Sequence, residues 1–386
     1  MPAKGMHGGP LGPALASASY MGQGRMAAGT EIERLAAGKI AGESLERIIL
    51  PYLGARRDDV LVGPRQGIDT GIVDLGGGQV MAVTADPFFV MPALGWERAA
   101  WFAVHIVASD AATSGLEPVY LAIDLNLPSA MTDAELAALW QSTAEICAAL
   151  GIAVVTGHTG RYEGCDYPML GGATMLCVGR HDAYVTPDMA LPGDSIIVTK
   201  GAAIETTGMI GALCPNLLAR SCGEGVARAA DALFEKMTVV EDARVAAAVG
   251  VREAGVTGMH DATERGIWGG LREIAEAAGV GLAVDADAII LRPEVRAVCD
   301  YLHIDPFATS SEGTLLITCR PGKTGEVVAR LGDAGIAASC AGEVVPASQG
   351  VRVTAHGREE PLLAPRSDPF WPALHRAMRE EAARDA

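Results

Sequence analysis

The order of hydrophobic patterns between residues 121 and 160 constrains the fold of this chain more than any other feature. Residues 121–127 alternate leucine or isoleucine with small or polar residues, which is the period-two pattern of a strand with one apolar face. Residues 132–135 have the form of a capping box before a helix that runs to 150, and the apolar run 152–155 predicts a buried strand. The sequence therefore predicts an α/β protein.

Polar residues follow the strand at 152–155. Thr156, Gly157, His158 and Thr159 are expected to form a turn over 156–160 at the end of that strand. The ends of strands are where α/β folds commonly place ligand-binding groups. This segment is a candidate cofactor-binding turn.

Three aspartates of the first half lie where an apolar run meets Gly, Thr or Ser. Asp69 is expected on the first strand of a hairpin over 68–75 and 79–83, and Asp86 just past its second strand. Asp110 is expected near the C-terminal end of a helix over 97–113, where the helix macrodipole disfavours a carboxylate.

Such a set suggests a site for metal and phosphate. Mg²⁺ prefers carboxylate oxygens and keeps open positions that substrate phosphates can fill. Any one aspartate is more typical of a helix cap or a turn, so the prediction depends on the set.

The chain of 386 residues is long enough for two domains. Residues 1–30 are expected to be a flexible arm, and a turn at 191–194 precedes a buried strand at 195–199. Helices are expected at 44–53, 207–218, 241–253 and around 271–275, with strands at 171–178 and near 282 and 315. We place the domains at 31–185 and 186–356, with 357–386 as a C-terminal tail or helix.

The charge balance disfavours nucleic acid as a partner. Lys and Arg number 30 against 47 Asp and Glu, a formal net charge of −17, which repels a phosphate backbone. No apolar stretch reaches the length of roughly 20 residues that a spanning helix needs, and no secretory signal is visible. We therefore expect a cytoplasmic protein that neither enters a membrane nor binds nucleic acid.

Phosphoryl transfer is the chemistry that the residues favour. It requires mainly positioning and charge neutralisation, which carboxylate-bound Mg²⁺ and a cation can provide. Lys200, at a strand end before Gly201, is either that cation or an ordinary surface lysine. Asp261 and Thr263 either orient a substrate or cap the following helix. The sequence contains neither a P-loop nor a Rossmann glycine motif.

Five segments together resemble the superfamily of aminoimidazole ribonucleotide synthetase (PurM), and within it the HypE-like hydrogenase-maturation proteins. The resemblance covers roughly residues 38–353. The segments, in chain order, are Thr84-Ala85-Asp86, Ser109 to Gly115, Gly151 to Thr159, His260 to Thr263 and Ser311 to Leu316.

The resemblance implies an N-terminal α/β domain whose sheet pairs with that of a second subunit, and a C-terminal α/β domain with a split β-α-β layer. It implies ATP and Mg²⁺ in a cleft at the dimer, and phosphorylation of an oxygen such as that of a carboxamide. Carried over by position, Asp69, Asp86 and Asp110 would hold metal and phosphates. The residues Thr156, Gly157, His158 and Thr159 would border the nucleotide.

This chain departs from the family pattern at three places. Many members have aspartate where His158 stands, and neutral imidazole is a poor Mg²⁺ ligand. Where the family reads Asp-Ala-Thr-Arg-Gly-Gly, this chain has Glu264-Arg265-Gly266 after Thr263, so Arg265 is strained if that glycine has φ > 0. HypE ends in a tail that carries an acceptor cysteine, whereas this sequence ends in Asp385-Ala386, so we expect no terminal cysteine as the carrier.

Three functional hypotheses follow, in this order. The first is that the chain is an ATP-dependent enzyme that activates a carboxamide or similar oxygen of a free metabolite, by dehydration or cyclisation. The second is that it is a HypE-like maturation factor that acts on a carboxamide carried by a partner protein. The third is that it is a nucleotide-binding homologue without catalysis.

Overall fold

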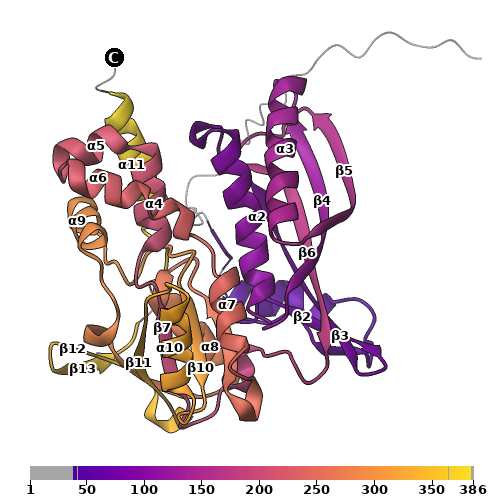
Figure 1. The fold of residues 1–386 in the computed structure, drawn as a ribbon, viewed down its shortest axis with the longest axis vertical. Coiled ribbons are helices and arrows are strands. Elements are labelled where there is room, and N and C mark those ends of the chain that lie inside the picture. Colours follow the sequence, from indigo (N-terminus) through magenta and orange to yellow (C-terminus); the bar gives the residue numbers. More distant parts are fainter. Residues whose placement is uncertain (1–37, 41, 364, 384–386) are drawn as a thin grey trace, which may run out of the picture. The chain divides into compact units, whose positions relative to one another are not determined.

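The computed structural model describes residues 38–40, 42–363 and 365–383. The arm expected over residues 1–30 lies outside them. Two mixed sheets are built from successive parts of the chain (Figure 1), and they bear out the expected two-domain α/β fold.

The N-terminal sheet has the strand order β1-β2-β3-β6-β4-β5. All its neighbours are antiparallel except β4 and β5. The strands are β1 Val60–Val62, β2 Gly71–Gly76, β3 Gln79–Phe89, β4 Pro118–Pro128, β5 Ala153–Tyr162 and β6 Met169–Arg180.

One face of this sheet is covered and the other is open. Helices α2 (Trp96–Ala112) and α3 (Asp133–Ala149) lie side by side on the covered face (Figure 1). Leu121, Ile123, Leu125 and Leu127 of β4 point into that core and are at most 4% exposed, as the alternating pattern predicted. The capping box of α3 is also confirmed, because Thr132 Oγ1 accepts the Glu135 N–H and the Glu135 carboxylate accepts the Thr132 N–H.

The C-terminal sheet has the order β13-β12-β9-β11-β7-β10-β8. Its neighbours are antiparallel except β12 and β9, which are parallel. The strands are β7 Ser195–Thr199, β8 Val256–Asp261, β9 Gly281–Asp285, β10 Leu315–Cys319, β11 Ala338–Val345, β12 Val351–Ala355 and β13 Arg358–Pro361.

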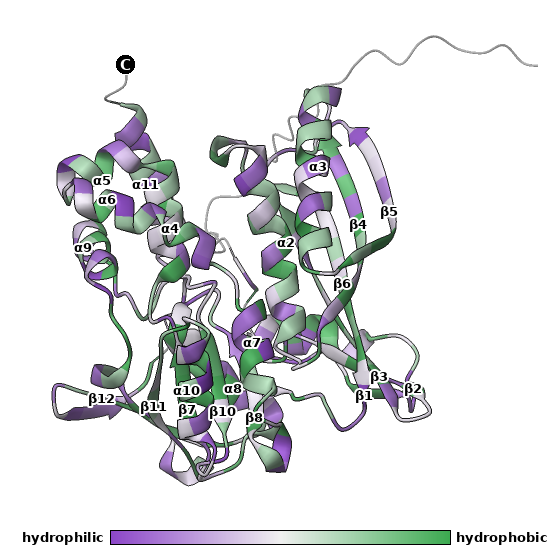
Figure 2. Ribbon diagram, viewed as in Figure 1, coloured by the Kyte–Doolittle hydropathy of each residue, from purple (hydrophilic) through white to green (hydrophobic). Residues whose placement is uncertain are grey.

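The central strands of this sheet are buried on both faces. Helix α8 (Gly266–Ala278) packs on one face, and α7 (Val240–Ala247) with α10 (Thr324–Asp333) packs on the other. Strands β7 and β10 accordingly contain consecutive apolar residues, 196–198 and 315–317, rather than an alternating pattern, and Figure 2 shows much of them in green.

A group of helices stands apart from this sheet (Figure 1) and shares a core that includes Phe89, Phe102 and Phe370. Its members are α4 Ile204–Leu213, α5 Pro215–Ser221, α6 Glu224–Asp231, α9 Pro293–Leu302 and α11 Phe370–Ala382. Among the described residues, no helix combines the length and the apolar character that a membrane crossing requires.

Several expected elements differ from the structure. The helix expected over 207–218 is two helices, because Pro215 lacks an N–H and starts α5 instead of continuing α4. The helix expected over 241–253 ends at Ala247 and is followed by a 3-10 turn at Arg252–Ala254. The helix expected over 44–53 begins at Gly42 and is mostly π-helix and 3-10 helix.

The largest difference concerns residues 156–160. They form no turn but continue β5, because their backbone pairs in parallel with residues 122–126 of β4. Asp69 lies before β2 rather than on it, and Asp86 lies within β3 rather than past it.

Candidate functional site

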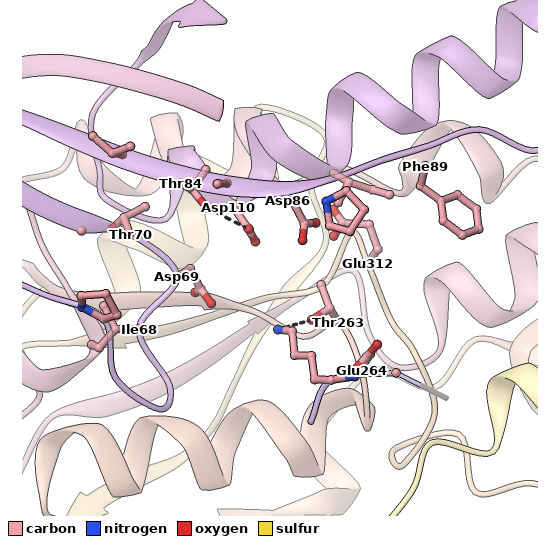
Figure 3. A pocket seen from close by; sticks show the side chains of 18 of the residues that line it. Ile68, Asp69, Thr70, Thr84, Asp86, Phe89, Asp110, Thr263, Glu264 and Glu312 are labelled. Carbon is pink, nitrogen blue, oxygen red and sulfur yellow. Dashed lines mark hydrogen bonds between the residues drawn. The ribbon is translucent and has the colours of Figure 1, made fainter. Parts of the chain in front are cut away.

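A cavity of about 860 Å³ lies between the N-terminal sheet and the loops that follow β8 and precede β10. Asp69, Asp86 and Asp110 line it together, although they come from the chain before β2, from β3 and from the end of α2 (Figure 3). The structure therefore brings the three aspartates of the sequence pattern to one site.

Each aspartate reaches the cavity differently. Asp110 is held by Thr84, whose hydroxyl donates to Asp110 Oδ2 at 3.1 Å (Figure 3). Asp69 Oδ2 accepts a hydrogen bond of 2.5 Å from His260 Nδ1. Thr263 also lines the cavity, as expected for a residue that orients a ligand.

Two buried carboxylates at this site lack hydrogen-bond donors. Among the described residues, neither oxygen of Asp261 nor either oxygen of Glu312 has a partner, and both side chains are 1% exposed. One ligand atom each from Asp69, His260 and Asp261 lies within 4.8 Å of the other two. An unpaired buried carboxylate is costly, and a bound cation removes that cost. Both ring nitrogens of His260 are engaged by Asp69 and Glu273, so the donors open to a cation are carboxylate oxygens, which suit Mg²⁺.

The cluster of acids perturbs its own titration. Burial raises the pKa of Asp86 to about 6, with Asp261 and Glu264 adding to the rise and Lys39 opposing it. Burial and the nearby Asp69 raise the pKa of Asp261 to about 6. The pKa values of Asp110 and Glu312 are raised well above their ordinary range by burial and by neighbouring carboxylates. Binding a divalent cation would reverse these shifts, since it stabilises the ionised forms.

His260 connects the cavity to a second set of charges. Its Nε2 bonds to Glu273 Oε2 at 2.8 Å, and Glu273 also accepts from Arg265 and from Gln66. Burial lowers the pKa of His260, but Asp69 and Glu273 outweigh it and hold the pKa well above the ordinary value. The ion pair between His260 and Asp69 therefore holds the Asp69 carboxylate in one orientation toward the cavity.

Among the described residues that line the cavity, the cation is Lys39 and not the expected Lys200. The Lys39 N–H donates to Glu264 Oε2 at 2.7 Å, and its Nζ lies 3.5 Å from Thr263 Oγ1. Lys39 is exposed as a whole residue. Partial loss of water around its ammonium lowers the pKa of Lys39, but the carboxylates of Glu273, Asp69, Asp110 and Asp261 raise the pKa by more.

Lys200 is placed elsewhere. It is 5% exposed, and its Nζ donates to the backbone carbonyl of Thr238 and to Asp242 Oδ1, each within 3 Å. Lys200 is not among the described residues that line either cavity. At the end of β7, the Lys200 ammonium forms a buried ion pair with Asp242 instead.

The expected cofactor-binding segment borders a second cavity of about 600 Å³ on the open face of the N-terminal sheet. Gly157 and His158 line it, with Thr156 and Thr159 on the same strand. His158 Nε2 lies 2.6 Å from the Tyr162 hydroxyl. Asp86 lines both cavities, so the two meet at β3.

The departure at Arg265 has the conformational consequence that the sequence implied. Arg265 has φ +64°, a left-handed conformation that glycine adopts without strain. Its N–H donates to Asp368 Oδ2 at 2.5 Å and its guanidinium pairs with Glu273, so these contacts hold it there.

Some functional residues had no signal of their own in the sequence. Lys39 and Glu205 line the cavity from segments that no motif marked. Glu273 could have been noticed, because a glutamate stands between Leu271 and Ile274 on the buried side of α8.

Two family models match the chain in succession. The AIR synthase related protein N-terminal domain matches residues 67–179, and the corresponding C-terminal domain matches residues 192–354. Together they span the chain from β2 to β12 almost completely, and β1 and β13 lie outside them.

Curated relatives are hydrogenase-maturation proteins. The hydrogenase expression/formation protein HupE of Azotobacter chroococcum is 33% identical over 56% of this chain and 60% of its own length. The carbamoyl dehydratase HypE of Rhodobacter capsulatus is 30% identical over 62% of this chain and 67% of its own. The chain thus spans about three fifths of the first of these relatives.

Solved structures share the fold. The crystal structure of E. coli HypE matches with a TM-score of 0.60 and 24% identity, covering 76% of this chain and 88% of that one. A HypE in complex with ATP matches with a TM-score of 0.55 and 20% identity, over 87% and 98% of the two chains. The matched domains, the relatives and the shared two-sheet architecture agree, and this chain belongs to the family of AIR synthase related proteins, among its HypE-like members.

Proposed function

We propose that this chain is an ATP- and Mg²⁺-dependent enzyme that activates the oxygen of a carboxamide by phosphoryl transfer. The observation that carries the proposal is the cavity in which Asp69, Asp86 and Asp110 converge beside the unpaired carboxylate of Asp261. Relatives named carbamoyl dehydratase, and a HypE solved with ATP, support the choice of chemistry and nucleotide.

The residues present fit both ligands. Asp69, Asp86, Asp110 and Asp261 would hold the metal and, through it, the phosphates. When bound, ATP with Mg²⁺ would supply the phosphoryl group that makes the amide oxygen a leaving group. In a dehydration, that oxygen leaves as phosphate, one amide proton goes with the phosphate and the other to solvent, and a nitrile remains. A cyclisation would instead replace the oxygen with a nitrogen of the same substrate.

The chain's own contribution is positioning and charge. Lys39 offsets the negative charge of phosphates at the carboxylate cluster, a role that the sequence had assigned to Lys200. Thr263 lies close enough to Lys39 to orient a ligand beside it. Such fixed charges account for most of the catalysis that phosphoryl transfer requires.

We place the nucleotide along the second cavity, where Gly157 and His158 border Asp86, with Thr156 and Thr159 flanking them on β5. A second copy of the chain would cover this open face and make a cytoplasmic homodimer with one site at each end of the interface. Domain limits at 31–185 and 186–356 accord with this division of roles.

Release of phosphate from ATP tests the proposal. With Mg²⁺ and a panel of carboxamides, release should depend on one added amide. Asp86→Asn should abolish it while the circular dichroism spectrum stays unchanged, because the amide neither binds Mg²⁺ well nor carries charge. Asp133→Asn is the control, since that side chain is 93% exposed on α3. Full turnover by Asp86→Asn would refute the metal assignment.

A second candidate function is that of a maturation factor whose carboxamide is borne by a partner protein. The naming of the relatives as hydrogenase expression/formation proteins favours it. Turnover that appears with a carbamoylated partner and with no free amide would establish it. Nucleotide binding in calorimetry without turnover of either kind would leave a binding homologue, as His158 and Arg265 suggest.

A further inference from the structure

The last helix of the chain helps to form the cavity. Helix α11 begins at Phe370, beyond the residues 192–354 that the C-terminal family model matches. Its first two residues, Phe370 and Trp371, line the cavity that Asp69 and Asp86 line. A segment outside the shared family domains therefore shapes the site of this particular chain.

These two rings complete an aromatic wall with Phe89 of β3 and Phe102 of α2. The Phe89 ring centroid lies 5.8 Å from that of Phe102, at an interplanar angle of 83°, and 5.8 Å from that of Trp371. Phe370 and Trp371 are 5.0 Å apart. All four line the cavity, with Trp371 half-buried at its surface and Phe102 and Phe370 behind it in the helix core. Figure 3 shows Phe89 beyond Asp86 and Glu312, away from Asp69. The cavity has an acidic end and an aromatic end.

The wall is fixed to the loops that carry the polar residues. Asp368 accepts hydrogen bonds from the Arg265 N–H at 2.5 Å, the Ser310 hydroxyl at 3.0 Å and the Phe370 N–H at 2.8 Å. The start of α11 is thus held against the loop before Gly266 and the loop that contains Glu312. These hydrogen bonds connect the aromatic end to the loops at the acidic end.

Two carboxyl groups lie between the acidic end and the aromatic end of the cavity. Glu205 and Glu312 line the cavity, and Glu205 Oε2 accepts the Glu312 N–H at 3.2 Å. Burial raises the pKa of Glu205 to about 8. The two carboxyl groups mark the boundary between the acidic end and the aromatic end of the cavity.

We propose that the aromatic wall, with the half-buried Trp371 as its accessible ring, binds the side group of the substrate, which is a free carboxamide with an aromatic or bulky apolar group. The inference rests on the proposed function, since it names the substrate class of the same site. A charged side group would lose its hydration against four rings without gaining a partner. The rival occupant is the adenine base, but the expected nucleotide-binding residues lie on the second cavity, on the other side of Asp86.

Binding of model amides tests this without requiring turnover. Benzamide and phenylacetamide are compared with acetamide and butyramide by calorimetry, with and without ATP and Mg²⁺. The wild-type protein should bind the aromatic amides at least about tenfold more tightly than acetamide, as expected for stacking and apolar burial. Trp371→Ala should remove most of this preference, and Trp371→Phe should restore much of it.

A control variant and three possible outcomes distinguish failure of this inference from failure of the proposed function. Trp140→Ala removes a tryptophan that is 38% exposed on α3 and should change nothing. Equal affinity for aromatic and small amides in the wild-type protein would overturn the inference. So would a Trp371→Ala variant that loses ATP affinity and keeps its amide preference, because adenine would then occupy the wall. Aromatic amides that bind through Trp371 and release no phosphate would count against the proposed function alone.

Discussion

At the scale of single residues, His260 is the side chain on which the acidic end of the cavity depends. Each of its ring nitrogens faces a carboxylate, Asp69 on one side and Glu273 on the other. An imidazole can donate to both only when both nitrogens carry protons, so the ring is an imidazolium between two carboxylates. The same contact that neutralises Asp69 also orients it toward the cavity.

Replacing His260 by glutamine should therefore destabilise the protein. A glutamine amide cannot donate to carboxylates on opposite sides, so one buried carboxylate loses its partner, at a cost of roughly 3–5 kcal/mol. Urea unfolding of His260→Gln measures this, and the Mg²⁺ concentration for half-maximal activity should rise as well. His181→Gln, at an exposed histidine, is the control. A variant as stable as the wild type would show that the two contacts contribute little.

Glu205 predicts a pH dependence of stability. Burial raises its pKa in the folded protein from the ordinary value of 4.5 to about 8. The unfolded chain releases this proton at lower pH, so the folded state loses stability as pH rises from 4.5 toward 8, by about 1.4 kcal/mol per unit of pH at most. Glu205→Gln should lack this loss, so its stability relative to wild type should grow across that range. Unfolding curves of both proteins, recorded in EDTA at several pH values, measure this difference. If the stabilities of the variant and the wild type change by the same amount with pH, the prediction is contradicted.

The sequence pattern predicted the three aspartates that the fold brings to the cavity, but not the lysine that lines it with them. Asp69, Asp86 and Asp110 were identified because each stands at a change from apolar to polar residues. The same reasoning marked Lys200, which the fold turns toward Asp242. A position at a strand end does not reveal which neighbours the side chain meets, and the contacts of Lys39 and Glu273 come from segments over two hundred residues apart.

At the scale of elements, β5 shows where local pattern and tertiary pairing disagree. Residues 156–160 have the Thr and Gly composition of a turn, yet they form a strand because β4 offers a parallel partner. Helix α3 and strand β4 were predicted correctly, because their signals, a capping box and an alternating face, are local. A strand stabilised by a neighbour 34 residues away in sequence, as residue 156 is from residue 122, leaves no comparable local mark.

Gly157 is needed for this pairing. A Cβ at position 157 would collide with the backbone carbonyl oxygen of Ile123, its partner on β4. Gly157→Ala should force the strands apart at the edge of the second cavity and cost roughly 1–3 kcal/mol. Thermal unfolding measures the cost, and ATP affinity should fall with it.

Gly160→Ala on the same strand is the matched control for Gly157→Ala. There the added methyl group would meet the end of the Tyr162 side chain at 2.6 Å, and that side chain can rotate away. The two variants should differ clearly in stability. Equal melting temperatures would show that the β4 to β5 contact tolerates a methyl group.

At the scale of the whole molecule, the open face of the N-terminal sheet is the surface that a second copy would cover. It exposes apolar side chains on neighbouring strands, including Tyr120 of β4 at 44% and Val178 of β6 at 40%. The second cavity lies on this face and shares Asp86 with the first. A partner placed there would enclose the nucleotide, so assembly and activity should be lost together.

Val178→Asp tests this link between assembly and catalysis. Two aspartates brought together across an apolar interface repel and lose hydration, so the dimer dissociation constant should rise by roughly two orders of magnitude. Sedimentation velocity should show a monomer with an unchanged circular dichroism spectrum, and amide-dependent phosphate release should fall in proportion to the dimer lost. Leu363→Asp adds the same charge at a side chain that is 82% exposed away from the sheet, and should remain dimeric and active. A monomeric Val178→Asp variant with full activity would mean that one chain forms the entire active site. His158 and the rest of β5 would then not be part of that site.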